Sequence, residues 1–170
     1  MEDKYATLFG GAMNITDSLE YNETVMIGEL LVEKGYTVKN GGYRGMMEAV
    51  SKGVYMAKGK SIGYTCATFP STKGNSYLTE TVVCNDIFDR LRNLVNGSEL
   101  FIIQRGGVGT ISELFLCLDI IRKQKENRPR IIAVGYFWKS ILKECEYLIS
   151  DNELAMIEVV NDFKEFKLKL

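Results

Sequence analysis

A glycine-rich turn carries the strongest chemical signal in the sequence. It follows an apolar stretch of strand length and opens a stretch of helical period, and it contains Gly106, Gly107, Val108, Gly109 and Thr110. Exposed backbone N–H groups and the positive end of a helix dipole bind phosphate without any side chain. The spacing matches neither a Walker A loop nor GxGxxG. The turn is therefore a candidate phosphate site. The alternative is a plain turn, in which Thr110 and Glu113 form a capping box.

An arginine and a glutamate are the candidate catalytic residues. Arg90 shares the apolar stripe of its helix with Ile87 and Leu94, and a buried charge requires an anionic partner. That partner is either Asp86, one turn earlier, or a phosphate or carboxylate of a ligand. Glu113 lies one turn into the helix after the glycine turn, within reach of Arg90. A carboxylate beside an arginine can position water or stabilise an oxocarbenium-like sugar, which favours glycosidic chemistry.

Two residue types limit the chemistry further. There are no histidines, which excludes a Ser-His-Asp triad, a His general base and every His-containing metal site. The four cysteines are widely separated, without a CxxC pair, and lie in apolar stretches; they are Cys66, Cys84, Cys117 and Cys145. We expect buried free thiols and no metal site.

Composition indicates an ordinary globular chain. The 170 residues are 46% hydrophobic and 25% charged, which suits one domain over residues 1–170. The net charge of -1 offers no surplus of positive charge for nucleic acid. No signal peptide is visible at the N-terminus, and no uncharged run has the length of a membrane span. We therefore expect a cytoplasmic protein without nucleic-acid or membrane partners.

Strand-length apolar runs alternate with helical periodicity along the chain. The six predicted strands are 5–9, 36–39, 61–66, 100–104, 131–134 and 156–160. Residues 67–78 form a long polar loop, and a helix is predicted over 79–95. This alternation predicts a Rossmann-like, three-layer α/β/α fold with a mainly parallel sheet of about six strands.

Such a fold brings two glycine turns together. Ligands of open α/β sheets bind beyond the carboxyl ends of the strands, where the strand order reverses. There, Gly10 and Gly11 after the first strand should meet the turn at 106–109. Gly42, in a second glycine-rich turn after the second strand, is either a further phosphate contact or a simple turn residue. The neighbouring Arg44 either neutralises a phosphate or is solvated.

Together these motifs resemble the LOG family of cytokinin riboside 5′-monophosphate phosphoribohydrolases, often labelled lysine decarboxylase-like. The resemblance rests on the residues 106–113, the arginine sixteen positions before Gly106, and the residues 41–47, with further matches at 75–80, 98–102 and 137–142. It implies a homodimer that hydrolyses a (modified) purine nucleoside 5′-monophosphate to free base and ribose 5-phosphate without a cofactor. Arg90 and Glu113 match the family's catalytic pair, and the glycine turn matches its phosphate loop.

Five residues depart from the family pattern. Arg105 replaces a proline, Leu91 a lysine and Glu48 a glycine, while Ala12 and Met13 replace two serines. An altered substrate is therefore as compatible with the sequence as the usual one. The alternative function is a nucleotide or cofactor carrier without turnover, similar to the molybdenum-cofactor carriers. Nothing in the chain frames a pyridoxal-phosphate-binding lysine, so literal lysine decarboxylation has no support.

Overall fold

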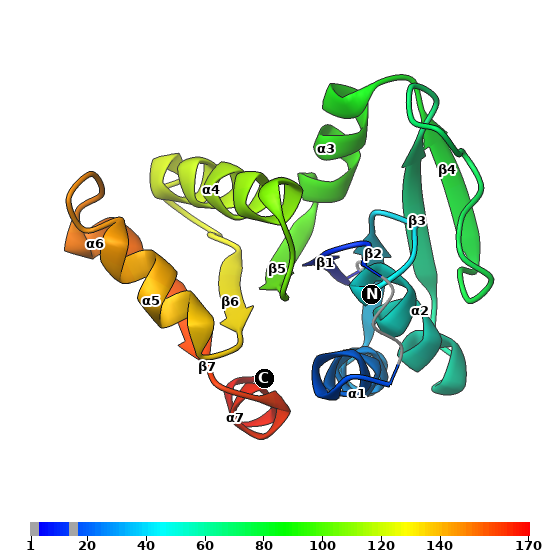
Figure 1. Ribbon diagram of the computed structural model, residues 1–170, viewed down its shortest axis with the longest axis horizontal. Helices are drawn as coiled ribbons and strands as arrows, with labels where there is room; N and C mark the ends of the chain where they lie inside the picture. The colour runs from blue at the N-terminus through cyan, green and yellow to red at the C-terminus, as the bar shows by residue number, and fades with distance from the viewer. Residues whose placement is uncertain (1–3, 14–16) are drawn as a thin grey trace.

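A parallel sheet runs through the middle of the protein (Figure 1). The computed structural model describes residues 4–13 and 17–170, and within them the sheet has seven strands. These are β1 (Lys4–Phe9), β2 (Tyr36–Asn40), β3 (Ser61–Cys66), β4 (Glu80–Cys84), β5 (Ser98–Ile103), β6 (Arg130–Val134) and β7 (Ile157–Val160). The order is β4-β3-β2-β1-β5-β6-β7, and every neighbouring pair is parallel.

Helices cover both faces of this sheet. They are α1 (Leu19–Glu33), α2 (Met46–Met56), α3 (Ile87–Val95), α4 (Val108–Lys123), α5 (Phe137–Glu144), α6 (Asp151–Leu154) and α7 (Phe163–Lys169). One apolar core joins α1, α2 and α7 to one face of the sheet, and a second core joins α3, α4 and α5 to the other (Figure 1). The predicted three-layer, Rossmann-like fold is therefore confirmed.

The predicted strand count was one too low. The segment 79–95, expected as one helix, contains strand β4 and the shorter helix α3. The β-branched Thr81, Val82 and Val83 favour an extended chain. Asp86 then begins α3, because its side chain accepts a hydrogen bond from the backbone N–H of Asp89 at 2.8 Å. The apolar spacing before Asp86 also fits a helical period, and this is why the helix prediction is wrong for residues 80–84.

The connection between β3 and β4 contains no helix, although the two strands are parallel. Residues 67–79 return along the sheet, and the chain is attached at both ends of this crossing. The backbone N–H of Asn75 donates to Gly42 O at 2.8 Å, and that of Thr79 donates to Ser61 O at 3.1 Å. Gly63 leaves room for Leu78 to pack across β3. The predicted loop is thus a segment that crosses the face of the sheet and is hydrogen-bonded to it.

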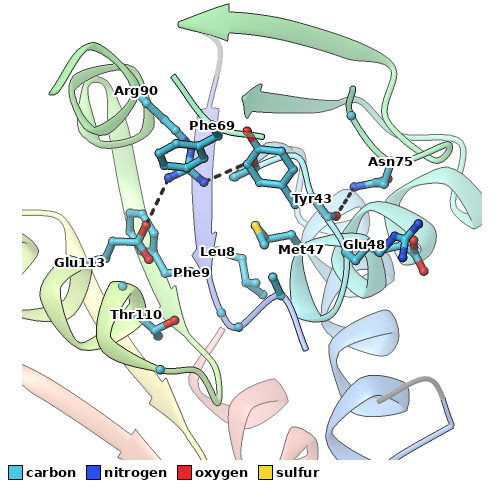
Figure 2. Close-up of a pocket in the computed structure, with 18 of the residues that line it drawn as sticks. Leu8, Phe9, Tyr43, Met47, Glu48, Phe69, Asn75, Arg90, Thr110 and Glu113 are labelled. Atoms are coloured by element: carbon cyan, nitrogen blue, oxygen red, sulfur yellow. Dashed lines mark hydrogen bonds and ion pairs between the residues drawn. The ribbon is translucent and has the colours of Figure 1, made fainter. Parts of the chain in front are cut away.

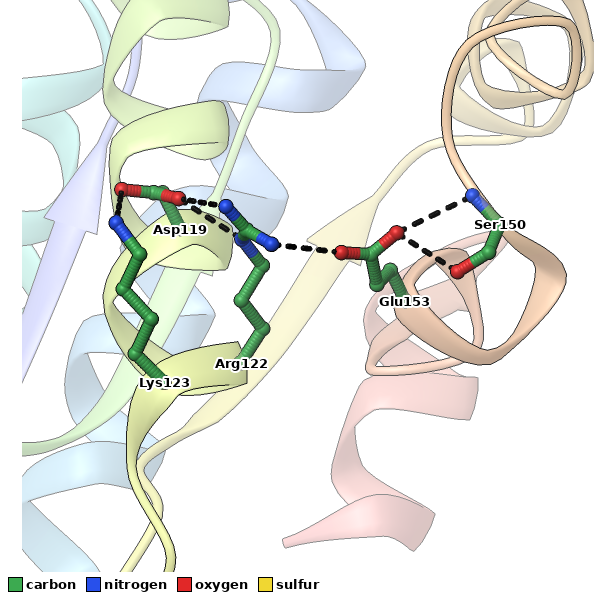
Figure 3. A network of polar contacts seen from close by, with 5 residues as sticks. All are labelled: Asp119, Arg122, Lys123, Ser150 and Glu153. Carbon is green, nitrogen blue, oxygen red and sulfur yellow. Dashed lines mark hydrogen bonds and ion pairs between the residues drawn. The ribbon is translucent and has the colours of Figure 1, made fainter.

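A polar network on the surface connects α4 to α6 (Figure 3). Asp119 pairs with Arg122 at 2.7 Å and with Lys123 at 2.7 Å, and Arg122 also pairs with Glu153 at 3.0 Å. Glu153 and Ser150 form the capping box of α6. Exposed pairs of this kind each contribute about 0–1 kcal/mol, so the network orients α6 more than it stabilises the fold.

Cys66, Cys84 and Cys117 are buried as expected, whereas Cys145 is half-buried; all four are free thiols. No cluster of three or more potential metal ligands occurs among the residues that the structure describes. The helices in the described ranges are all too short or too polar to cross a membrane.

Candidate functional site

The strand order reverses between β1 and β5, and the turns after these strands touch each other. The backbone N–H of Gly11 donates to Arg105 O at 2.9 Å, and that of Gln104 donates to Phe9 O at 2.8 Å. This is the place where an open parallel sheet binds its ligand. The predicted meeting of the two glycine turns is confirmed.

The glycines of these turns serve two different purposes. A Cβ on Gly10 would lie 2.5 Å from Met46 Cβ, and a Cβ on Gly106 would overlap the hydroxyl of Thr110. Packing inside the protein therefore demands both glycines. Gly107 and Gly109, in contrast, have no neighbour within 4 Å of an added Cβ. At these two positions the backbone is bare, in the sense that no other group lies where a side chain would be. Packing within the described residues therefore does not require glycine there.

A cleft of about 1040 Å³ opens on this bare backbone. From the first strand turn and α4, its lining includes Gly10, Gly11, Ala12, Gly107, Val108, Gly109, Thr110, Ser112 and Glu113. The opposite wall comes from the 41–48 turn, the segment 69–76 and α3. Two predicted binding residues lie outside this lining. Gly42 has a positive φ of 82° and packs against Gly63, while Gly106 borders a smaller pocket of about 290 Å³.

The first turn of α4 presents its N–H groups to the cleft. Gly107 is the N-cap of α4 and has no side-chain cap. The alternative of a capping box formed by Thr110 and Glu113 is therefore wrong, because Thr110 lies inside the first helical turn rather than at the cap. The first N–H groups of a helix have no partner within the helix. Here they coincide with the bare backbone of Gly107 and Gly109, an arrangement that suits an anion.

Arg90 and Glu113 meet at the wall of the cleft (Figure 2). Arg90 Nη1 lies 3.8 Å from Glu113 Oε1, and both side chains are largely buried. Arg90 Nε also donates to Tyr64 O at 2.7 Å, and Nη2 donates to Gly41 O at 3.3 Å. Asp86, the alternative partner, uses its carboxylate to cap α3 instead. Three contacts thus hold the guanidinium in one place.

Two aromatic rings complete the surroundings of Arg90. The centroids of Tyr43 and Phe69 each lie 5.7 Å from the guanidinium carbon, and the rings stack on each other with centroids 6.0 Å apart. Sequence reasoning missed both residues. The only available signals were the tyrosine inside the second glycine turn and the phenylalanine at the start of the long loop.

Burial raises the pKa of the Glu113 carboxyl to about 7, although the positive charge of Arg90 acts in the opposite direction. Desolvation favours the neutral acid, and the neighbouring guanidinium favours the carboxylate. Glu113 consequently exchanges a proton near neutral pH. A carboxyl group in this range can take a proton from water and return it to a leaving group.

The departures from the family pattern lie in different places. Leu91 and Ala12 line the cleft, but Met13 is exposed and lies outside it. Arg105 pairs with Glu20 at 3.1 Å and borders the smaller pocket, so it does not supply a charge to the cleft. Arg44, in contrast, does line the cleft.

Glu48 also lines the cleft and accepts a hydrogen bond from the hydroxyl of Tyr21 at 3.2 Å. Burial and the charge of Glu48 raise the pKa of Tyr21 to about 12. The hydroxyl of Tyr21 therefore remains protonated and keeps donating to Glu48 at neutral pH.

Comparison with known proteins identifies the family. A family model described as "Possible lysine decarboxylase" matches residues 47–169. The chain belongs to this LOG-like family. An uncharacterized protein from Archaeoglobus fulgidus is 33% identical over 129 residues, which cover 70% of this chain and 78% of that protein.

Solved structures of the same fold include two proteins linked to the molybdenum cofactor. The molybdenum cofactor binding protein from Rippkaea orientalis has a TM-score of 0.77 and 19% identity, over 98% of this chain and 94% of that chain. The molybdenum cofactor carrier protein from Chlamydomonas reinhardtii has a TM-score of 0.76 and 17% identity, over 99% and 96%. At these identities the likeness shows the fold of this LOG-like chain.

Proposed function

We propose that the protein hydrolyses the N-glycosidic bond of a purine or modified-purine nucleoside 5′-monophosphate. The observation that carries this proposal is the Arg90–Glu113 pair, which lies 3.8 Å apart beside the bare first turn of α4. Phosphate bound by the N–H groups of Gly107–Thr110 brings the sugar toward Glu113, since this residue lies three positions after Thr110 on the same helix.

The reaction then uses one water molecule and no cofactor. Glu113, as the carboxylate, takes a proton from water while the water oxygen bonds to the anomeric carbon. The C–N bond breaks, its electron pair leaves with the base, and the base takes up the proton that Glu113 received from water. Arg90 keeps Glu113 oriented and lowers its pKa, so that a useful fraction is ionised at neutral pH.

The direct experiment measures ribose 5-phosphate and free base from a panel of nucleoside 5′-monophosphates, including N6-modified AMP. Glu113→Gln should reduce turnover by at least about 100-fold, because general base catalysis typically contributes that much. Glu99→Gln, at an exposed glutamate that is the second residue of β5, is the matched control and should retain full activity. Equal turnover by wild type and Glu113→Gln would overturn the proposed role.

The second candidate is a carrier that binds a nucleotide or cofactor without turnover. It is favoured by the similarity to the two molybdenum-cofactor proteins along almost the whole chain and by the loss of a cation at Leu91. Binding of nucleotide without release of base, in wild type and in Glu113→Gln alike, would select this candidate. The Arg90–Glu113 pair is the observation that favours the enzyme.

We also propose that the protein forms a homodimer through apolar side chains beside the cleft. Val108 and Phe88 are 87% and 73% exposed, and Ile111, one turn along α4 from Val108, is 37% exposed. Exposed apolar side chains become buried when they lie in an interface, so these residues of α3 and α4 are the candidates for it. Sedimentation should show a dimer that Phe88→Glu weakens, and a monomeric wild type at micromolar concentration would refute it.

A further inference from the structure

The groups that line the cleft follow one another in a fixed order. The first turn of α4 ends at Thr110, Glu113 follows on the same helix, and Arg90 contacts Glu113 at 3.8 Å. Beyond Arg90 lie the rings of Tyr43 and Phe69, each 5.7 Å from the guanidinium. Figure 2 shows this progression from Thr110 to Phe69. A ligand with its anion on α4 and its sugar at Glu113 therefore directs its third part toward the two rings.

Both rings are held in place before any ligand arrives. The hydroxyl of Tyr43 accepts the N–H of Cys66 at 3.0 Å and donates to Ser71 O at 3.0 Å. The backbone N–H of Phe69 donates to Cys66 O at 3.2 Å. The segment that carries Phe69 is thus attached to the end of β3 and to Tyr43. A ligand gains affinity from such a surface because little has to be ordered on binding.

The amide nearest to these rings is already engaged. Asn75 Nδ2 donates to Tyr43 O at 3.0 Å, and Asn75 Oδ1 accepts the N–H of Tyr77 at 3.1 Å. An amide is the side chain best suited to recognise the hydrogen-bonding edge of a base, and this one holds the loop instead. Met47, Ile87 and Leu91 add apolar surface to the same cleft. These groups offer flat and apolar contacts, while Arg44 and Lys73 add charged groups to the same lining.

From this arrangement we propose that Phe69, supported by Tyr43, is the platform on which the base of the nucleotide stacks. The proposal rests on the function proposed above and names the residue that holds the base. The planar face and apolar bulk of the base determine how much of this platform it covers. Purine nucleotides, including those with an apolar substituent, bind better than pyrimidine nucleotides because the larger ring system covers more of the platform.

Binding to the Glu113→Gln variant tests the platform separately from catalysis. Calorimetry would compare AMP, CMP and ribose 5-phosphate, the last of which has no base. Phe69→Leu keeps an apolar side chain and removes its π-face, so AMP should bind about 10-fold more weakly while ribose 5-phosphate is unaffected. Phe69→Tyr should restore AMP binding, since it restores the ring.

Tyr77 provides the matched control. It belongs to the same segment and packs against Tyr55 with ring centroids 5.9 Å apart, but it does not line the cleft. Tyr77→Leu should leave the affinity for AMP unchanged. If Phe69→Leu weakens the binding of AMP and of ribose 5-phosphate equally, or weakens the binding of neither, the platform is refuted. Phe69 would then serve only to cover Arg90.

Failure of the proposed function would look different. If wild type binds AMP and Phe69→Leu weakens it selectively, but no base is ever released, the platform stands and the glycosidase does not. Wild type and Phe69→Leu can also both release base. If the ratio of kcat/KM for purine nucleotides to that for pyrimidine nucleotides is then the same in the two proteins, the glycosidase stands and the platform does not. Absence of AMP binding would refute both.

Discussion

Arg90 occupies the space that a side chain on Gly41 would need. A Cβ at position 41 would overlap Arg90 Nη2 and approach the sulfur of Met47 at 2.6 Å. The same arginine group donates to the carbonyl of Gly41 at 3.3 Å. The glycine thus fixes the guanidinium by both its carbonyl and its missing side chain.

Gly41→Ala should therefore displace Arg90 from Glu113. A misplacement of about 1 Å at a reacting centre can cost about 100-fold, and we expect a loss of that size in kcat. Steady-state kinetics with the best nucleotide substrate would measure it. Thermal unfolding run in parallel would show whether the variant remains folded. Unchanged kcat in a folded variant would show that Arg90 tolerates a new position.

Gly109→Ala should separate stability from binding. An added methyl group meets nothing within 4 Å, and alanine is favoured over glycine inside a helix by about 0.5–1 kcal/mol. Urea unfolding should show this gain in stability. The same methyl group would stand between phosphate and the N–H groups of α4, so KM for nucleotide should rise. A variant that is more stable and binds nucleotide equally well would exclude anion binding at this turn.

The titration of Glu113 should respond to Arg90. Burial raises its pKa to about 7 against the lowering effect of the arginine. Removing the positive charge in Arg90→Gln should move the pKa further upward. Carbon-13 NMR of labelled glutamate, with Glu113→Gln used to assign the signal, would follow both titrations. A downward shift in Arg90→Gln would contradict the electrostatic account.

The same group should make stability depend on pH. The folded-state pKa of Glu113 is raised from 4.5 to about 7, so the folded protein binds this proton more tightly than the unfolded chain does. This proton therefore contributes to the free energy of unfolding. The contribution is complete below about pH 4.5 and is lost as pH rises toward 7, by roughly 3 kcal/mol in total. Relative to wild type, Glu113→Gln should therefore gain stability between pH 5 and pH 8. Urea unfolding of both proteins at pH 5 and pH 8 would measure this. If the difference between their free energies of unfolding is the same at the two pH values, the pKa shift is disproved.

The parts of the site that sequence could predict depend on local rules. Glycines at the ends of apolar strands indicate tight turns, and the topology of parallel sheets places β1 beside β5. An arginine on an apolar stripe must find an anionic partner, and the predicted alternatives are Asp86 and a phosphate or carboxylate of a ligand. Glu113 is predicted only to lie within reach of Arg90. In the structure Glu113 is the partner, because Asp86 is used as a helix cap.

The parts that sequence could not predict depend on contacts between distant segments. Strand β4 is a short edge strand that packs through Val82, and its apolar spacing also fits a helix. Phe69 lies beside Arg90 because the chain turns directly after β3, and no local signal reveals that the two residues meet. The distinction between Gly106 and Gly107 required knowledge of which neighbour each one faces.

The helix-free crossing from β3 to β4 has a consequence for how such a protein can diversify. A crossover helix must keep its length and its apolar stripe, because both faces of the sheet are packed. Residues 67–79 are attached at the end of β3, at Asn75 and at Thr79. Between these points the segment needs neither a fixed length nor an apolar stripe. Insertions around Phe69 would reshape one wall of the cleft and leave the helical layers intact. This segment is where new ligand preferences can evolve, or be engineered, at little cost to folding.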